Sequence, residues 1–308
     1  ARGRYIRQGR PAAGLGGIVH GTETNRLTEF RAGLALADMC VSPLPRHWGP
    51  VATAVCLLVC ACATSPRGRK QLIFFSEQEM QVMGNRAFEE LKKEQRLANQ
   101  PQLTRYVECV TDRVVAVLEQ PEGRRWEVVV FADPQANAFA LPGGKIGVFR
   151  GMLDIASTQD QLAAVIAHEV GHVIARHGAE RVSQRVVIEG GLAAVSAAVG
   201  DGVKGPLIMG ALGLGATVGV LLPYSRTHEA EADAIGMSLM ARAGFNPKAA
   251  VTLWQKMARA NGEQPPEFLS THPAPSTRIE ELQAQLPQAR ALYKEARRKG
   301  REPSCTPP

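Results

Sequence analysis

Aromatic residues are scarce in this sequence, at 5% of 308 positions, and no basic patch contains interleaved aromatic side chains. The net charge of +7 comes mostly from residues 1–61, which hold seven arginines against three acidic residues. Residues 62–308 therefore hold 29 basic and 26 acidic residues, a nearly even balance. We expect no nucleic-acid partner. With 45% hydrophobic and 21% charged residues, the chain can bury a sizeable core.

Cysteine is scarce outside one short stretch. The six cysteines are Cys40, Cys56, Cys60, Cys62, Cys109 and Cys305. Four of them precede residue 63, so their spacing is unlike that of a small domain held together by disulfides. Cys109 and Cys305 can pair in an oxidising compartment, although their separation in sequence says nothing about geometry.

Long hydrophobic runs are few, and the clearest one is too short to cross a membrane. Residues 51–63, VATAVCLLVCACA, span about 13 positions, which is the length of a signal-peptide core. The run contains VCAC, which ends at Cys62 and resembles the lipobox of bacterial lipoproteins. Cys62 is then the lipidated first residue of the mature protein, and Ala63 after it resembles lipoproteins sorted to the outer membrane. A short buried helix rich in cysteine is the alternative.

These features predict five segments. Residues 1–38 are a non-native or disordered extension, because Met39 stands where a start codon gives a short basic leader; a genuine basic extension is the alternative. The other four are a signal peptide ending in the lipobox (39–61), a lipidated cysteine with a polar tether (62–75), a folded domain (76–286) and a basic C-terminal tail (287–308). The predicted location is the periplasmic face of the outer membrane in a Gram-negative bacterium.

Hydrophobic periodicity predicts a mostly helical α+β domain with a small sheet. Helices are expected from a capping box at Ser76 toward Leu97, over 103–119 and over 157–177. Strands are expected over 126–131 and 138–149, the second interrupted by LPGG at 141–144. The proline and glycines suit a strand at the sheet edge, where an extended peptide can add by backbone pairing. A hairpin that merely closes the core is the alternative.

The helix predicted over 157–177 carries HEVGH. His168 and His172 lie four residues apart, so both imidazoles can ligate one ion, for which zinc is the expected metal. Glu169, beside the first histidine, can take the proton of a metal-bound water and pass it to the leaving amine. His177 is nine residues after His168, so a continuous helix turns it away from the metal.

A third ligand is expected farther along the chain, in SRTHEAEADAIG at 225–236. Ser225 or Thr227 caps a helix there, and His228 is expected to be a cap or surface residue. Spacing leaves two arrangements open. The ligand is Glu229 with Asp233 behind it on the same helix face, or it is Glu231 with both others solvated.

Together, HEVGH and SRTHEAEADAIG resemble the gluzincin family that contains the HtpX and BepA proteases and the CAAX-prenyl endopeptidases, peptidase family forty-eight. The resemblance implies a zincin-like domain with one zinc ion, held by His168, His172 and Glu229. It implies that Glu169 is the general base and that Asp233 orients a zinc-binding histidine. NAFALPGGKIGVFRGML resembles the substrate-binding edge strand of the family, which precedes the HExxH helix.

FLSTHPAPSTRIEEL resembles the Thr-His-Pro segment of the periplasmic members. In BepA-like members the matching histidine can take the fourth zinc position and close the enzyme, so His272 is a candidate switch ligand. After Pro287 too few residues remain for a tetratricopeptide-repeat domain, which predicts a lipoprotein type without repeats. The apolar stretch 186–222 is expected to form two helices packed on the catalytic core, with a transmembrane hairpin as the alternative.

The predicted function is that of a zinc metalloendopeptidase which degrades misfolded or stalled envelope and outer-membrane proteins. Its partners are unfolded or misassembled polypeptides and, through the lipid anchor, the outer membrane; the outer-membrane assembly machinery is a further candidate. The rival prediction is a chaperone-like holdase for outer-membrane proteins, with the active site closed by His272.

Overall fold

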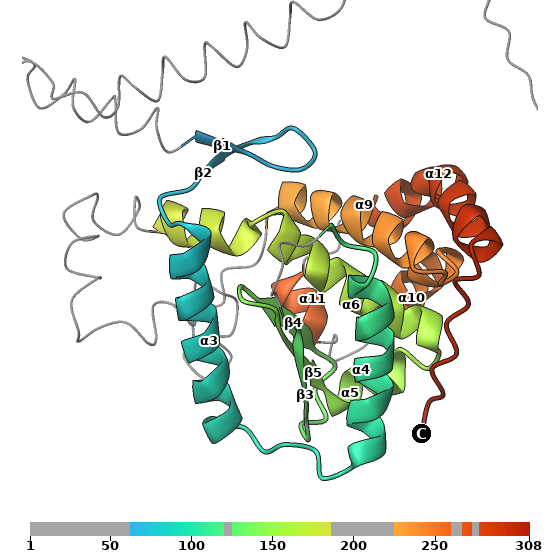
Figure 1. The fold of residues 1–308 in the computed structure, drawn as a ribbon, viewed down its shortest axis with the longest axis horizontal. Coiled ribbons are helices and arrows are strands. Elements are labelled where there is room, and N and C mark those ends of the chain that lie inside the picture. Colours follow the sequence, from blue (N-terminus) through green and yellow to red (C-terminus); the bar gives the residue numbers. More distant parts are fainter. Residues whose placement is uncertain (1–61, 120–124, 186–224, 260–266, 273–276) are drawn as a thin grey trace, which may run out of the picture. The chain divides into compact units, whose positions relative to one another are not determined.

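The computed structural model describes residues 62–119, 125–185, 225–259, 267–272 and 277–308 (Figure 1). In chain order the elements are β1 (Cys62–Thr64), β2 (Lys70–Leu72), α3 (Glu77–Glu94), α4 (Pro101–Val115), β3 (Glu127–Phe131), β4 (Ala138–Leu141), β5 (Lys145–Phe149), α5 (Arg150–Ile155), α6 (Gln159–Ile174), α9 (Arg226–Arg242), α10 (Lys248–Arg259), α11 (Glu267–Thr271) and α12 (Arg278–Arg298). The predicted signal peptide and the stretch 186–222 lie outside the described residues. The elements confirm the predicted mostly helical α+β fold.

The segment 62–75 differs from the predicted tether, because it forms a β-hairpin. β1 pairs antiparallel with β2, in a register that places Cys62 opposite Leu72. The side chain of Gln71 is buried and donates a hydrogen bond to the carbonyl of Ala175, 2.7 Å away, at the end of α6. The next apolar side chains, Ile73 and Phe75, are buried as well. The polar composition of this segment therefore gave no sign of a hairpin that is hydrogen-bonded to the end of α6.

The predicted capping box opens α3. The Ser76 hydroxyl accepts a hydrogen bond from the Glu79 N–H at 3.2 Å, and the Glu79 carboxylate accepts one from the Ser76 N–H at 2.7 Å. Both contacts satisfy N–H groups that have no partner inside the helix. The helix buries Phe88 and Leu91 on one side and keeps charged residues on the other.

The predicted interrupted strand is a pair of strands joined by a tight turn. Gly143 and Gly144 both have positive φ, 91° and 77°, which favours glycine at these positions. The sheet order is β3-β5-β4, with β5 parallel to β3 and antiparallel to β4. Among the described residues β4 is therefore an edge strand, as predicted, and it comes before the HExxH helix.

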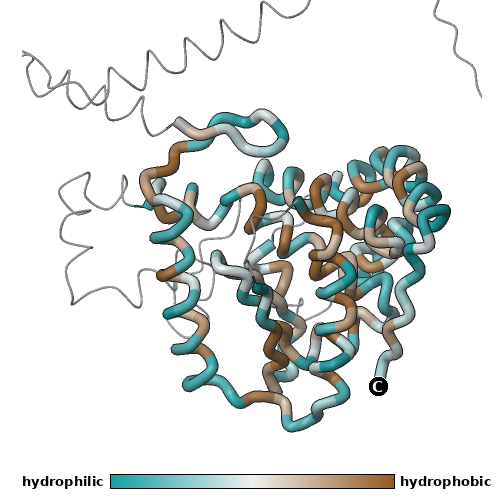
Figure 2. The backbone as a smooth tube through the Cα atoms, in the orientation of Figure 1, coloured by the Kyte–Doolittle hydropathy of each residue, from teal (hydrophilic) through white to brown (hydrophobic). Residues whose placement is uncertain are grey.

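Each face of the sheet supports its own apolar cluster. Val130, Ile146 and Val148 point to the side of α4 and α6, where the larger cluster lies. Alternate residues, among them Phe131 and Phe139, point to the side of α3. Figure 2 shows the strands as the apolar centre between these helices. The sheet is thus covered on both faces, and its edge is brought up against α6.

The two helices that carry the motifs cross at very short range. A Cβ atom on Gly171 of α6 would lie 2.9 Å from the carbonyl oxygen of Ala232 in α9. A Cβ atom on Gly236 of α9 would lie 2.8 Å from the backbone nitrogen of His168. Larger residues at either glycine would separate the helices, so the two glycines set the distance between HEVGH and the acidic residues of α9.

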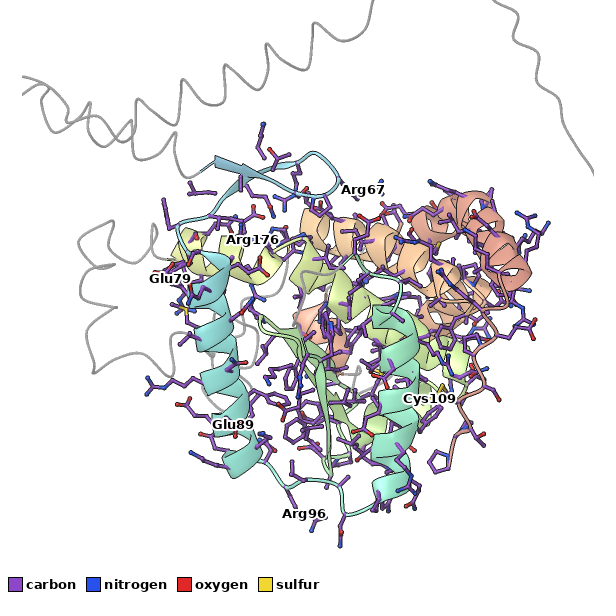
Figure 3. The ribbon with its side chains drawn as sticks, in the orientation of Figure 1. Arg67, Glu79, Glu89, Arg96, Cys109 and Arg176 are labelled. Carbon is purple, nitrogen blue, oxygen red and sulfur yellow. A yellow bond between two sulfur atoms is a disulfide. The ribbon has the colours of Figure 1, made fainter. Side chains whose placement is uncertain are left out.

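The C-terminal residues belong to the domain, which corrects the predicted boundary at 286 and the predicted tail. α12 continues through Pro287 to Arg298. Pro287 is exposed, so the carbonyl that loses its helical hydrogen bond can be hydrated by water. Beyond the helix, Cys305 forms a disulfide with Cys109 of α4 (Figure 3), which confirms the pairing that the sequence allowed.

Within the part of the chain that the structure describes, no helix has both the length and the apolar composition required to span a bilayer.

Candidate metal centre

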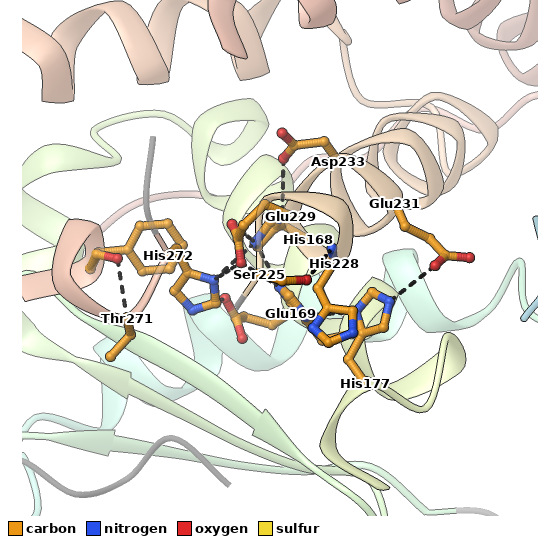
Figure 4. A network of polar contacts seen from close by, with 12 residues as sticks. His168, Glu169, His177, Ser225, His228, Glu229, Glu231, Asp233, Thr271 and His272 are labelled. Atoms are coloured by element: carbon orange, nitrogen blue, oxygen red, sulfur yellow. Dashed lines mark hydrogen bonds and ion pairs between the residues drawn. The ribbon is translucent and has the colours of Figure 1, made fainter. Parts of the chain in front are cut away.

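Helix α6 delivers the three residues of the HExxH motif. Thr158 caps the helix, with its hydroxyl accepting a hydrogen bond from the backbone N–H of Gln161 at 3.2 Å. His168, Glu169 and His172 are 4%, 2% and 1% exposed, so none of them faces bulk water. The imidazoles meet edge-on, with Nε2 of His172 only 3.0 Å from Nε2 of His168. The predicted convergence of the two histidines is therefore present. Figure 4 shows His168 and Glu169 at this site.

Helix α9 brings the carboxylate of Glu229 to both imidazoles. Ser225 caps it, because its hydroxyl accepts a hydrogen bond from the N–H of His228. The Glu229 carboxylate, 1% exposed, lies 3.4 Å from Nε2 of His168 through one oxygen and 3.4 Å from Nε2 of His172 through the other. Glu231 lies outside this group, so the structure favours the first of the two arrangements that spacing left open.

His272 completes the group from the opposite side. It follows α11, and its backbone N–H donates to the carbonyl of Phe268, whose ring stacks on the imidazole at 4.4 Å. Its Nδ1 lies 3.0 Å from Glu229 Oε1 and 3.2 Å from His168 Nε2. Its ring centre also lies 5.1 Å from that of His172, so the candidate switch residue contacts all three predicted zinc ligands.

The four side chains have the donor chemistry of a zinc site. One ligand atom from each of His168, His172, Glu229 and His272 lies within 4.8 Å of all the others, and all four residues are buried. A neutral His168 that donates its Nδ1 hydrogen to a carboxylate presents an Nε2 lone pair to the group. A neutral His172 with its hydrogen on Nδ1 also presents its Nε2 lone pair there. Nitrogen lone pairs and a carboxylate that converge in a buried space are stabilised by a cation, and two or three imidazoles with a carboxylate suit zinc.

Asp233 and Arg278 contact residues of this cluster through their polar side-chain atoms. Asp233 Oδ1 lies 2.9 Å from Nδ1 of His168, one helical turn beyond Glu229, as the resemblance implied. Arg278, 1% exposed, donates at 2.7 Å both to Glu229 and to Asp233 and lies flat over Trp254 at 3.4 Å. Arg278 is not among the site residues predicted from the sequence. Its signal is a basic residue on the buried face of α12, four positions before the buried Leu282.

The electrostatics of the cluster favour bound positive charge. Burial alone would raise the pKa of Glu229, but the imidazoles of His272 and His168 hold it well below its usual range. Burial lowers the pKa of His172 well below its usual range. It also acts to lower that of His168, but hydrogen bonds to Asp233 and Glu229 prevail and raise this pKa to about 9. Without a metal, a proton on His168 provides the positive charge that these carboxylates attract.

Glu169 differs from the other carboxylates because it faces the sheet. Burial raises the pKa of Glu169, with a backbone hydrogen bond from Ala140 of β4 acting in the opposite direction. Its Oε1 is buried and makes no hydrogen bond to the described residues; Nε2 of His272 lies 3.4 Å away. A buried carboxylate oxygen without a hydrogen bond, next to the cluster, is placed to accept a proton there.

His177 is outside the metal cluster, as expected, but the prediction that a continuous helix turns it away was wrong. α6 ends at Ile174, and Arg176 has φ of 56°, so the chain changes direction before a second helical run at 177–185. His177 therefore lies behind the metal cluster, with its Nδ1 2.9 Å from Nδ1 of His172 and its Nε2 3.2 Å from Glu231 Oε2. Burial lowers the pKa of His177 to about 4, so the ring is neutral near pH 7.

His228 was also predicted wrongly, because it is neither a cap nor a surface residue. Its side chain is 3% exposed and stacks on the ring of His177 at 4.4 Å. Its Nε2 lies 3.1 Å from a carboxylate oxygen of Glu180. Cys62, the predicted lipidation site, is the first residue of β1.

The comparisons agree with this geometry. Residues 101–286 match the model of Peptidase family M48. The mitochondrial metalloendopeptidase OMA1 of Schizosaccharomyces pombe is 42% identical over 188 residues, which are 60% of this chain and 54% of the relative. The beta-barrel assembly-enhancing protease of Escherichia coli K12 is 29% identical over 223 residues, 70% of this chain and 45% of the relative. The chain thus spans about half the length of the curated relatives it matches.

The family match covers more than half of the chain and includes HEVGH, the acidic motif of α9 and His272. It confirms the resemblance drawn from these motifs. The chain therefore belongs to peptidase family M48, a family of zinc metallopeptidases, and its buried His-His-Glu-His cluster is able to hold one metal ion.

Proposed function

We propose that the chain is an endopeptidase that cleaves polypeptides in extended form, with His168, His172 and Glu229 as the zinc ligands. The observation that carries the proposal is the buried cluster of four metal-binding side chains, with the carboxylate of Glu169 beside it and strand β4 next to both. The geometry offers a metal position, a proton acceptor and an adjacent strand edge, which is what hydrolysis of an extended peptide requires.

Each residue of the site has a separate role in the proposed hydrolysis. Held by these residues, zinc would supply a Lewis acid that makes water a stronger nucleophile near neutral pH. Glu169 accepts the proton of the attacking water and donates it to the leaving amine. Asp233 holds the His168 ring through Nδ1, and Arg278 holds both Asp233 and Glu229, so the ligands stay in place during the reaction.

Strand β4 is the candidate platform for the substrate. It is at the sheet edge among the described residues, and its Ala140 already donates a backbone hydrogen bond to Glu169. A cavity of about 660 Å³ adjoins the same region and is lined in part by Ala140, Pro142, His172 and Arg176. An extended peptide that pairs with β4 is held through its backbone, which predicts cleavage with little sequence preference.

Metal removal tests the proposal directly. Protein loaded with one equivalent of zinc is expected to cleave unfolded casein, and removal of zinc with a chelator is expected to abolish cleavage. Readdition of stoichiometric zinc should restore it, while magnesium should not, because magnesium prefers oxygen ligands. Casein fragments are quantified by electrophoresis and mass spectrometry. Equal cleavage before and after verified zinc removal contradicts the proposal.

A second candidate function follows from the contacts of His272. Its Nδ1 is within 3.2 Å of His168 and of Glu229, so it can occupy the ligand position that an attacking water needs. With this position filled, the protein binds unfolded outer-membrane proteins without cutting them, as a holdase. We favour the protease, because a holdase has no need of a buried carboxylate, such as that of Glu169, placed to accept a proton beside the metal position.

Replacing His272 by alanine is expected to raise casein cleavage by about tenfold, which corresponds to a preference of about 1.4 kcal/mol for the closed arrangement. Initial rates of the zinc-loaded variant and wild type are compared. Ser270→Ala, an exposed position on the same segment, is the matched control and should leave the rate unchanged. A His272→Ala protein that is no more active than wild type counts against the switch.

We further propose that the substrates are misfolded or stalled envelope proteins and that Cys62 carries a lipid anchor on the periplasmic face of the outer membrane. The name of the Escherichia coli relative connects that protein with β-barrel assembly, and the names of the OMA1 relatives connect those with mitochondria. The lipobox-like VCAC favours the bacterial location and leaves the outer-membrane assembly machinery as a candidate partner. Mass spectrometry of the mature N-terminus tests this, since an unmodified Cys62 contradicts it.

A further inference from the structure

A chain of polar contacts continues behind the metal cluster to the N-terminal hairpin. From His172 it passes to His177 (Nδ1 to Nδ1, 2.9 Å) and on to Glu231 (Nε2 to Oε2, 3.2 Å). The same Glu231 oxygen accepts a hydrogen bond from Nε of Arg69, at 2.9 Å. Arg69 lies directly before strand β2, outside the residues 101–286 that match the family. Figure 4 shows His177 and Glu231 beside the cluster.

The direction of each hydrogen bond in this chain follows from the first. If His172 presents its Nε2 lone pair to the metal, its single hydrogen is on Nδ1 and is donated to Nδ1 of His177. His177 then carries its own hydrogen on Nε2 and donates it to Glu231. The Glu231 carboxylate, at the end of this series of hydrogen bonds, accepts this hydrogen and thereby selects the tautomer of both His172 and His177.

Arg69 donates hydrogen bonds to two carboxylates, that of Glu231 at the end of this series of contacts and that of Glu180. Its Nη1 and Nη2 donate to the two carboxylate oxygens of Glu180 at 2.8 and 2.7 Å, while Nε donates to Glu231. Glu180 in turn contacts His228, whose ring stacks on His177. The guanidinium therefore fixes the carboxylates that contact both stacked imidazoles. A lysine, with one charged centre, cannot reproduce this fork.

We propose that Arg69 is a positioning residue of the metal centre: through Glu231 and His177 it sets the tautomer and orientation of His172, which makes the β1–β2 hairpin a working part of the zinc site. The proposal rests on His172 being a zinc ligand, as in the proposed function. It assigns a role to a segment that the sequence presented as a tether. Arg69 has no contact with the cluster itself and acts only through the side chains between.

The test measures zinc affinity in the full chain by competition with a chromophoric chelator, together with the visible spectrum of the Co²⁺-loaded protein. Arg69→Met is expected to weaken zinc binding by about tenfold, and to shift the cobalt bands, because the His172 ring is no longer fixed. Arg67→Met, on the exposed turn of the same hairpin (Figure 3), is the matched control and should change neither. Arg69→Lys should recover only part of the loss.

A second variant separates positioning from folding. Glu231→Gln keeps the side-chain shape and is expected to weaken zinc binding to a similar extent. Adding Arg69→Met to Glu231→Gln should then weaken zinc binding only slightly further, because both residues act through the same series of hydrogen bonds. Wild-type affinity and spectrum in Arg69→Met overturn the proposal, as do equal losses in Arg67→Met or full additivity in the double variant. A wild-type protein that binds no zinc contradicts the proposed zinc site instead, so the two failures are distinguishable.

Discussion

Replacing Glu169 by glutamine is expected to lower casein cleavage by about a thousandfold, within the range of general base catalysis, while the zinc content stays at one per chain. Glutamine has the shape of glutamate but cannot accept a proton. Glu169 is a suitable acceptor because burial raises its pKa and its Oε1 makes no hydrogen bond to the described residues. It is also distinct from the predicted zinc ligands, so its loss should leave the metal bound.

The measurement is the initial rate of casein cleavage, with zinc determined on the same sample by elemental analysis. Glu108→Gln, an exposed position on α4, removes a carboxylate of the same kind and should keep the wild-type rate. A Glu169→Gln protein that holds zinc and cleaves within tenfold of wild type rules out Glu169 as the general base. Loss of zinc together with activity would assign Glu169 to metal binding instead.

The sequence was most informative where one helix carried the whole pattern. The spacing of His168 and His172 needs only the geometry of α6, which local capping at Thr158 and apolar periodicity already predict. The choice between Glu229 and Glu231 needs more, because it depends on how α9 is rotated against α6. That rotation is set by the close crossing at Gly171 and Gly236, a contact between distant segments.

The errors have a common physical origin in long-range structure. His177 was misplaced because Arg176 adopts a left-handed backbone conformation that periodicity does not reveal for a residue other than glycine. The hairpin was taken for a tether because its polar side chains, Arg69 and Gln71, are satisfied by partners more than 100 residues away. Polar composition indicates exposure only when such distant partners are absent.

Replacing Arg278 by methionine is expected to lower the free energy of unfolding of the zinc-free protein by about 3–5 kcal/mol. The guanidinium is buried and donates at 2.7 Å to Glu229 and to Asp233. Methionine can still cover Trp254, so most of the packing is retained, but two buried carboxylates lose their cation. The cost is the burial of negative charge without compensation, measured by chemical denaturation of wild type and variant.

Dependence on pH distinguishes this electrostatic cost from a packing defect. Burial acts to raise the pKa of Asp233, but Arg278 helps to keep this pKa below its ordinary value of 3.8. Wild type therefore gains stability above the unfolded pKa and loses it as the pH falls through the folded one. Without the arginine, burial raises the pKa of Asp233, so the buried carboxyl of the variant takes up a proton at a higher pH than in wild type. The deficit of Arg278→Met should therefore be largest near pH 7, where this carboxylate is charged and unpaired, and should narrow toward pH 4 as it becomes neutral. Arg290→Met, exposed on the same helix, should change stability by less than about 0.5 kcal/mol at either pH. A deficit that stays constant from pH 7 to pH 4 would show that Arg278 contributes through packing on Trp254 rather than by holding the carboxylates of the metal centre.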